Sequence, residues 1–246
     1  MRVGLIADIH GNLVALEAVL AALARERVER IVCLGDVAVL GPQPEAVFAR
    51  LRALGIPCVL GNTDAWLVDE HAHDRTDPAR ATMVALTDWC TAQLGAADVA
   101  FLRACPPTLR LALDAGRELL CCHGSPRSFD DVIAATTPDE ALTAMLAGER
   151  AAVIVGGHTH VQLLRRHDAM LIVNVGSVGL PGTGPGTPDL PINRAVRWAE
   201  YGVVEAHEGG LEVALHRVPL DLRAVLAAGR ASGMPQFAWW RDRWDR

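Results

Sequence analysis

Polar residues that can bind a metal ion follow several short apolar segments of this chain. Asp8 and His10 come directly after the apolar segment 3–7, and Asp36 comes after the apolar segment 31–34. The same pattern recurs further along the chain at Asn62, Asp64, His123, His158 and His160. Carboxylate, amide and imidazole groups form a set of oxygen and nitrogen ligands that suits divalent cations of hard or borderline character.

The size of this set favours two metal ions over one. The seven residues other than Asp64 are too many to bind one tetrahedral zinc ion. They are enough to bind two cations that share a bridging carboxylate. Asp8 and His10 are two positions apart, as are His158 and His160. In an extended strand end this spacing places both side chains on one face, so we expect each pair to bind a common centre.

Alternating strands and helices must bring these residues together. The apolar segment 3–7, a helical spacing of leucines and valines over 13–23 and the apolar segment 31–34 predict a βαβ crossover. Further strands are expected over 57–60, 109–113, 118–122, 152–155, 161–164, 171–175, 196–206 and 211–218, some of them in hairpins. Ligands of open α/β sheets gather beyond the carboxyl ends of strands, so side chains far apart in sequence can converge there.

Helix signals and loop signals complete this outline. Further helices are expected between Pro44 and Gly55, over 78–94, and from Asp221 onward. The segment 137–140 has the pattern of a capping box, which predicts a helix that ends by Gly148. Residues 181–191 are rich in Pro and Gly and are expected to form a long loop.

Five motifs follow one another along the chain: Asp8-Ile9-His10, Gly35-Asp36, Gly61-Asn62-Thr63-Asp64, His123-Gly124 and Gly157-His158-Thr159-His160. In this order they resemble the motifs of the calcineurin-like metallophosphoesterase superfamily. Three further segments resemble its small prokaryotic phosphodiesterase branch: Gly41-Pro42, His123-Gly124-Ser125-Pro126 and Asn174-Val175-Gly176-Ser177-Val178-Gly179. The resemblance implies an α/β fold in which two mixed β-sheets form a sandwich flanked by helices, a four-layer arrangement. We expect one such domain over residues 1–246, with a C-terminal helical tail from about residue 221.

The same resemblance implies a division of the ligands between two divalent ions, which could be Mn, Fe, Zn, Ni or Co. One ion would take Asp8, His10, Asp36 and His160, and the other would take Asp36, Asn62, His123 and His158, so that Asp36 bridges them. A hydroxide between the two ions would attack a phosphate ester. Many relatives have a histidine where this chain has Thr63, and a threonine cannot protonate a poor leaving group.

Two further residues were considered as catalytic, each with an alternative. Asp64 either orients a ligand histidine or caps a helix. Arg127 either binds a phosphate through bidentate hydrogen bonds, as a phosphate clamp, or is an exposed, solvated arginine. Asn12 is expected to cap the helix over 13–23, and the Trp239, Trp240, Trp244 tail is expected to cover the core or to form a subunit contact.

Composition excludes several classes of protein. All 23 basic residues are arginine, which excludes a lysine nucleophile, and the net charge of −6 argues against nucleic acid as a partner. No apolar run approaches the roughly 18 residues that a membrane span needs, and the N-terminus lacks the features of a signal peptide. The six cysteines have no C-x-x-C spacing, which indicates reduced thiols and a cytoplasmic protein.

These observations predict a metal-dependent hydrolase that acts on a phosphodiester, either a small phosphate ester or a nucleotide-derived molecule. The alternatives are a phosphomonoesterase or protein phosphatase with the same centre, and a binding scaffold of the same fold without catalysis. An exposed strand edge or the tryptophan tail could also form a homo-oligomer.

Overall fold

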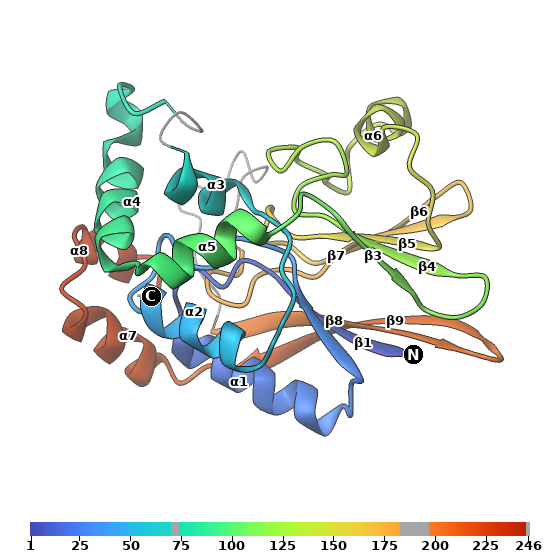
Figure 1. Cartoon of the computed structure of the whole chain (residues 1–246), viewed down its shortest axis with the longest axis horizontal. Coiled ribbons are helices and arrows are strands. Elements are labelled where there is room, and N and C mark those ends of the chain that lie inside the picture. Colours follow the sequence, from blue (N-terminus) through green and yellow to red (C-terminus); the bar gives the residue numbers. More distant parts are fainter. Residues whose placement is uncertain (70–73, 183–196, 245–246) are drawn as a thin grey trace.

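Two mixed β-sheets lie face to face, and helices cover the outer face of each (Figure 1). The computed structural model describes residues 1–69, 74–182 and 197–244. The first sheet contains, in spatial order, β2 (Arg30–Cys33), β1 (Arg2–Ile6), β8 (Trp198–His207) and β9 (Gly210–Pro219). The second contains β3 (Leu109–Ala112), β4 (Glu118–Cys121), β5 (Val153–Gly156), β7 (Met170–Asn174) and β6 (Leu163–His167). The predicted fold class is therefore confirmed.

Eight α-helices surround the sheets among the described residues. They are α1 (Leu13–Arg25), α2 (Pro44–Ala53), α3 (Asn62–Val68), α4 (Ala81–Gln93), α5 (Ala96–Ala104), α6 (Asp139–Leu146), α7 (Leu222–Ala231) and α8 (Phe237–Arg241). A short 3-10 helix, η1 (Pro78–Arg80), precedes α4. None of the helices in the described part of the chain has the length and apolar character needed to cross a bilayer.

Strand β1 separates two parts of the hydrophobic core because its side chains alternate between its two faces. Val3 and Leu5 are fully buried between the two sheets, in contact with a cluster that includes residues of β4 and β5. Ile6 instead packs with Leu16 and Leu23 of α1. The Asn12 side chain accepts a hydrogen bond from the backbone N–H of Ala15 at 3.1 Å, so the predicted N-cap of α1 is confirmed.

The parallel strands of both sheets end at one edge of the sandwich. β1 is parallel to β2, and β4, β5 and β7 are parallel to one another. The carboxyl ends of β1, β2, β4 and β5 lead into the loops that carry most of the predicted metal residues (Figure 1). The crossover from β1 through α1 to β2 and both predicted hairpins, β3 with β4 and β8 with β9, are confirmed.

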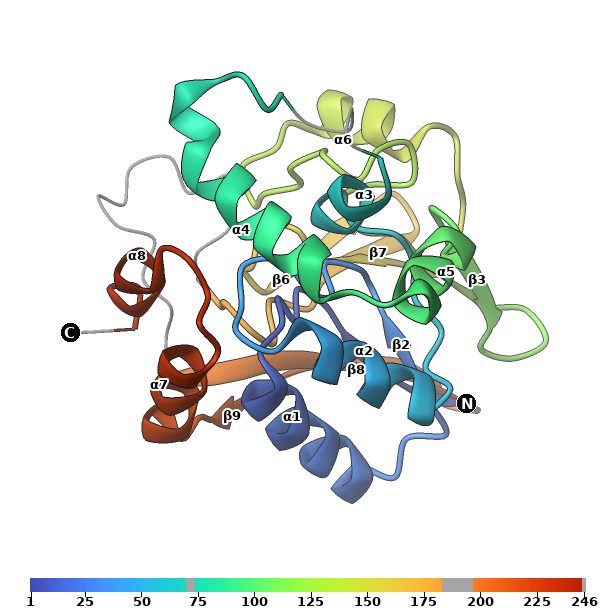
Figure 2. The same ribbon diagram turned by 60° about the vertical axis from the view of Figure 1, so that its left-hand side comes forward.

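Helices α4, α7 and α8 pack together beside this edge (Figure 2). Their shared cluster contains Leu86, Val225, Trp240 and Trp244, each at most 3% exposed. The expectation that the tryptophan tail covers the core is thus confirmed for Trp240 and Trp244. Helix α7 begins where predicted, because Asp221 accepts hydrogen bonds from the backbone N–H groups of Arg223 and Ala224.

Four local predictions were wrong in detail. The segment 57–60 forms only a single bridge, between Cys58 and Cys33, because Pro57 has no N–H to extend the ladder. The strand expected over 161–164 begins at Leu163, after a turn. Helices α3 and α5 were missed because short helices show too little periodicity. The predicted capping box is absent from α6, since the hydroxyl of Thr137 accepts a hydrogen bond from the N–H of Ala134 instead.

Most of the loop expected over 181–191 lies outside the described residues.

Candidate metal centre

The loops that follow β1, β2, β4 and β5, together with the start of α3, bring all of the predicted metal residues to one buried place. Each of these residues is at most 8% exposed, and short side-chain distances link them: Asp8, His10, Asp36, Asn62, His123, His158 and His160. Burial of so many ionisable groups is costly unless they pair with one another or with a cation.

The backbone of these loops is left-handed rather than extended. Asp8, His10, Asp36, His158 and His160 have φ values between 47° and 68°. Such values are uncommon for residues other than glycine and persist where the surrounding structure imposes them. Asp8 and His10 converge through a left-handed turn, with Nε2 of His10 4.0 Å from Oδ1 of Asp8. His160 instead lies beside His10, and His158 lies beside Asn62. The extended geometry expected for both pairs, and the common centre expected for His158 and His160, were therefore wrong.

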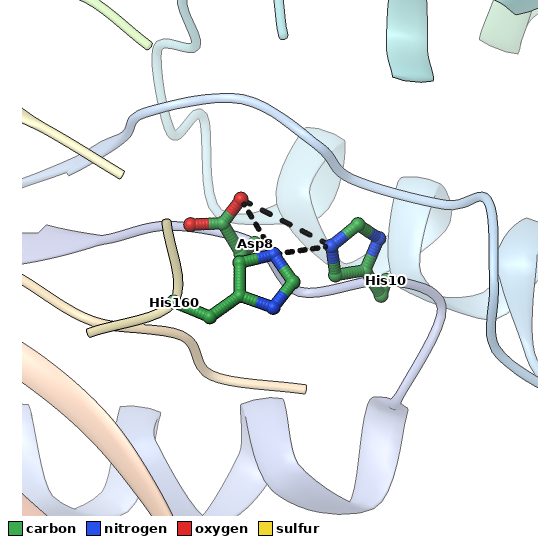
Figure 3. A group of neighbouring side chains, drawn as sticks. All are labelled: Asp8, His10 and His160. Carbon is green, nitrogen blue, oxygen red and sulfur yellow. Dashed lines mark hydrogen bonds and ion pairs between the residues drawn. The ribbon is translucent and has the colours of Figure 1, made fainter. Parts of the chain in front are cut away.

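Asp8, His10 and His160 form a first cluster (Figure 3). The Nε2 atoms of the two histidines are 3.0 Å apart, and Oδ1 of Asp8 lies 3.3 Å from Nε2 of His160 and 4.0 Å from Nε2 of His10. No hydrogen-bond donor reaches Oδ1 of Asp8 from the residues that the structure describes. A buried carboxylate oxygen without a donor needs another source of positive charge.

Backbone carbonyls determine the tautomers of these two histidines. Nδ1 of His10 lies 2.8 Å from the carbonyl oxygen of Val39, and Nδ1 of His160 lies 2.8 Å from that of Leu180. Because a carbonyl only accepts, each Nδ1 carries the proton and the neutral ring presents a lone pair at Nε2. Burial lowers the pKa of His10 to about 4, so this ring is neutral at pH 7. Two facing lone pairs and a carboxylate oxygen fit a cation.

His123 and Asn62 belong to a second cluster, beside Asp36 and His158. Nε2 of His123 lies 3.5 Å from Oδ1 of Asp36 and 3.1 Å from Oδ1 of Asn62, which is also 3.0 Å from Nδ1 of His158. The Nδ1 atom of His123 lies 2.7 Å from the carbonyl oxygen of Leu34. Nε2 of His123 therefore faces oxygen atoms, as a metal-binding nitrogen would.

Two carboxylates connect the clusters. Asp36 has Oδ2 3.8 Å from Nε2 of His10 and Oδ1 3.5 Å from Nε2 of His123, so its two oxygens face opposite clusters. Oδ1 of Asp8 lies 3.3 Å from Nε2 of His160 and 3.9 Å from Nε2 of His123. The resemblance to the superfamily implied only Asp36 as a shared residue, and in the structure Asp8 also lies between the two clusters.

The charges of the second cluster are strongly coupled. Burial lowers the pKa of His123, but the attraction of Asp36 and Asp8 outweighs burial and raises this pKa to about 10. Burial likewise opposes ionisation of Asp36, yet His123 and the neighbouring histidines hold its pKa well below its usual range. Burial and the nearby His123 lower the pKa of His158 to about 4. His123 thus carries positive charge where no cation is bound.

Comparison with known proteins decides the family. Residues 1–188 match the model of the calcineurin-like phosphoesterase superfamily domain. The chain belongs to this superfamily. The crystal structure of a metallophosphoesterase from Sphaerobacter thermophilus is similar over 99% of both chains, with 26% identity and a TM-score of 0.72. The resemblance that the five motifs predicted is confirmed.

Two archaeal proteins are also similar to this chain, one in structure and the other in sequence. A hypothetical protein of Pyrococcus horikoshii OT3 has a similar structure, with 22% identity, a TM-score of 0.79 and coverage of 96% of this chain and 94% of the other. An uncharacterized protein of Methanocaldococcus jannaschii is 23% identical over 240 residues, which are 96% of this chain and 94% of the relative. Because each match covers 96% of this chain, both extend beyond residue 188, where the match to the superfamily domain ends.

Asp64 supports the loop that carries Asp36. Its carboxylate accepts hydrogen bonds from the backbone N–H groups of Asp36 at 2.7 Å, Val37 at 2.8 Å and Gly61 at 3.1 Å. Burial and the negative charge of Asp36 raise the pKa of Asp64 to about 7. Of the two roles considered for Asp64, the cap is observed, at the start of α3, and it also holds the backbone of Asp36.

Arg127 is not brought to the centre. Its guanidinium pairs with both carboxylate oxygens of Asp131, at 2.7 Å and 3.1 Å, and its side chain is 45% exposed. The structure thus shows an exposed arginine paired with Asp131 and outside the cavity wall, as the second alternative expected. A phosphate clamp by this residue stays a prediction. Asp131 was missed because an i, i+4 ion pair needs no motif to form.

A cavity of about 430 Å³ opens onto the centre. His10, Asp36, Asn62, His158 and His160 lie in its wall. The rest of the wall contains Leu40, Thr63, Trp66, Arg80, Met83, Asp130, Val132, Leu180, Trp239 and Arg243. Most of the latter residues fit no motif. They come from α3, η1, α4, the C-terminal tail and the loops that follow β2, β4 and β7, so sequence reasoning missed their role in shaping the site.

Proposed function

We propose that the protein is a phosphodiesterase that depends on two divalent metal ions. The observation that carries this proposal is the junction of two side-chain clusters by Asp8 and Asp36, with an oxygen of Asp8 that lacks any donor among the described residues. A single-ion site would need only one of these clusters. Membership of the calcineurin-like phosphoesterase superfamily supports a hydrolase that acts on phosphate esters.

The proposed ligand sets follow the side chains that lie closest together. One cation would bind Asp8, His10, Asp36 and His160, and the other would bind Asp36, Asn62, His123 and His158. Oxygen and nitrogen ligands of this kind suit Mn, Fe, Zn, Ni or Co. Two bound cations of this kind polarise phosphoryl oxygens and lower the pKa of a water molecule held between them.

Backbone carbonyl groups orient three of the proposed histidine ligands. Carbonyl oxygens of Val39, Leu180 and Leu34 hold the imidazoles of His10, His160 and His123 so that Nε2 faces the centre. Fixed tautomers and ring orientations raise the affinity of a histidine for metal. This arrangement keeps the ligands in place before a cation or a substrate arrives.

Thr63 is the proposed hydrogen-bond donor to a phosphoryl oxygen. Its side chain is almost fully buried, its Oγ1 has no partner among the described residues, and it lies in the cavity wall beside Asn62. A hydroxyl donates one hydrogen bond without giving up its proton. The leaving oxygen of the ester would then depart without an acid, which favours esters with stabilised leaving groups.

The cavity favours a diester over a monoester. A diester has an organic substituent on each side of the phosphorus, and the cavity wall offers apolar surface from Trp66, Met83 and Trp239.

We also propose a reducing cytoplasmic location, because all six cysteines are free thiols in the structure, and five of them are buried.

Hydrolysis of bis-p-nitrophenyl phosphate by metal-stripped protein, re-supplied with Mn²⁺ or another divalent ion, tests the proposal. We expect turnover that requires metal, exceeds turnover of p-nitrophenyl phosphate and collapses in Asp36→Asn. Asp168→Asn, which changes an exposed carboxylate in the turn between β6 and β7, is the matched control and should retain activity. A preference for the monoester would favour a phosphomonoesterase, and metal binding without turnover of either ester would favour a scaffold.

A further inference from the structure

We propose that Arg243 and Trp239 form an anion-binding subsite that holds a second negative charge of the substrate, on the substituent that stays with the phosphate. The inference rests on the proposed function and adds the class of substrate. The substrate would be a phosphodiester whose retained substituent carries a carboxylate or a further phosphate, as a nucleotide-derived molecule does.

The guanidinium of Arg243 is held in place but lacks an acidic partner. It stacks on the indole of Trp239, with Cζ 3.2 Å from the ring centroid, and one of its N–H groups donates to the carbonyl oxygen of Trp239 at 2.9 Å. Across the described residues, no carboxylate lies within ion-pair distance of it, whereas Arg2, Arg110 and Arg165 are each paired with acidic side chains. Its remaining N–H donors can therefore serve a ligand.

The position of this arginine is determined by packing. Trp240 and Trp244, on either side of it in sequence, are 1% and 3% exposed and lie in the cluster that joins α4, α7 and α8. A side chain on Gly229 of α7 would crowd the Trp240 ring, at about 2.5 Å. The tail is thus fixed against the body, and Arg243 and Trp239 are presented to the cavity by a rigid element.

The subsite and the proposed metal ligands share one cavity. Arg243 and Trp239 lie in the same wall as His10, His158 and Thr63. Trp66 and Met83 also line it and offer apolar surface for the part of the substrate between the two charges. A phosphate held by the metal residues would leave the charged end of its retained substituent free to reach Arg243.

Other charges in the cavity limit what the subsite can take. Arg80 adds a second guanidinium, which lies 3.8 Å from Asp77, and Asp130 adds a negative charge. This mixture suits one additional anionic group better than a polyphosphate chain. Guanidinium groups bind carboxylate and phosphate through paired hydrogen bonds, so both are suitable as that group.

The subsite lies outside the part of the chain that matches the superfamily domain. That match ends at residue 188, whereas Trp239 and Arg243 belong to the C-terminal tail. The metal residues all lie within the match. We infer that the tail selects the substrate and that the superfamily domain performs the chemistry.

Two diesters with the same leaving group test the inference. They are 4-nitrophenyl phenyl phosphate and 4-nitrophenyl 4-carboxyphenyl phosphate, compared by kcat/KM in wild type, Arg243→Gln and the control Arg241→Gln. Arg241 is a neighbouring arginine of α8 that pairs with Asp242. We expect wild type to prefer the carboxylated ester about tenfold or more, as a charge-assisted hydrogen bond would provide. The preference should fall to about one in Arg243→Gln and persist in Arg241→Gln.

Binding of the same two esters to metal-stripped protein, measured by calorimetry, separates this inference from the proposed function. Tighter binding of the carboxylated ester by wild type than by Arg243→Gln supports the subsite even where metal restores no turnover, in which case only the proposed function fails. Metal-dependent turnover with equal kcat/KM for both esters in wild type overturns the subsite and leaves the proposed function intact. An equal preference in wild type and in a folded Arg243→Gln variant also overturns it.

Discussion

Nε2 of His10 lies 3.0 Å from Nε2 of His160, although both rings donate a proton from Nδ1 to a backbone carbonyl. Two neutral imidazoles in this arrangement direct lone pairs at each other, and Oδ1 of Asp8 approaches the same point. Each of the three atoms is an acceptor. Such a contact is unfavourable by itself and becomes favourable when a cation lies between the groups.

A cation at this point should therefore stabilise the fold. Adding Mn²⁺, Zn²⁺, Co²⁺ or Ni²⁺ to metal-stripped protein at about a thousandfold excess over Kd should contribute about 4 kcal/mol, a rise in Tm of roughly 8 to 16 °C. Differential scanning fluorimetry measures the shift. His10→Gln should lose most of it, whereas His207→Gln, at the exposed end of β8, should retain it. An unchanged Tm with every ion would contradict the metal centre.

Metal uptake should release a proton from His123. Its pKa of about 10 in the metal-free protein keeps it protonated at pH 8, and a ligand nitrogen must be unprotonated. His10 and His158, with pKa values of about 4, are already neutral and release none. Calorimetry at pH 8 in buffers of different ionisation enthalpy should therefore count about one proton more per protein in wild type than in His123→Gln, in which only water bound to the cations can supply one.

The sign of the pH dependence follows from the same values. As the pH rises from 8 through 10, metal-free His123 loses its proton before metal binds, so the number of protons released by wild type should fall by about one. The His123→Gln variant is the control, and it should release about one proton fewer than wild type at pH 8. A count that does not change between pH 8 and pH 11 would contradict this assignment.

Replacing Asp64 should destabilise the protein even without metal. Asp64→Ala leaves the buried N–H groups of Asp36, Val37 and Gly61 without an acceptor, at a cost of about 1–3 kcal/mol each. Urea unfolding of the metal-stripped variant measures the loss, which we expect to exceed about 3 kcal/mol.

A turn on the surface offers a matched comparison for Asp64. Asp114 also accepts backbone N–H groups, from Gly116 and Arg117, but in an exposed turn where water can replace it. Asp114→Ala should therefore cost about 1 kcal/mol or less. An equal loss of free energy of unfolding in Asp64→Ala and Asp114→Ala would show that burial does not increase the cost of removing these hydrogen bonds.

Thr63→His should change the dependence of the rate on the leaving group. A histidine at this position can protonate a departing alkoxide, whereas the hydroxyl of Thr63 cannot at useful pH. Diesters with poor leaving groups should gain about tenfold or more in kcat, and p-nitrophenyl esters should gain little. A series of aryl and alkyl esters measures the slope, with Thr63→Ser as the control. Unchanged kinetics for poor leaving groups would rule out this explanation.

Short local patterns were sufficient to predict much of the molecule. Alternating and helical spacings of apolar residues predicted β1, α1 and β2 and the two hairpins, because each pattern reflects a single element with one buried face. The two-sheet fold was implied by the resemblance of the five motifs to the superfamily. Polar residues at strand ends predicted the seven members of the centre, since parallel strands end at one edge.

Contacts between segments far apart in sequence determined the backbone conformation at the site, the partners of Asp64 and the position of the tail. No local sequence pattern encodes such contacts. The left-handed backbone at Asp8 and His160 is imposed by surrounding loops. Asp64 faces the backbone of Asp36 across 28 positions, and Arg127 pairs with Asp131 rather than facing the centre. The tail that places Trp239 and Arg243 in the cavity is docked by Trp240 and Trp244, whose packing depends on helices from two ends of the chain. Side-chain direction in such places is a result of three-dimensional packing, which a one-dimensional pattern does not contain.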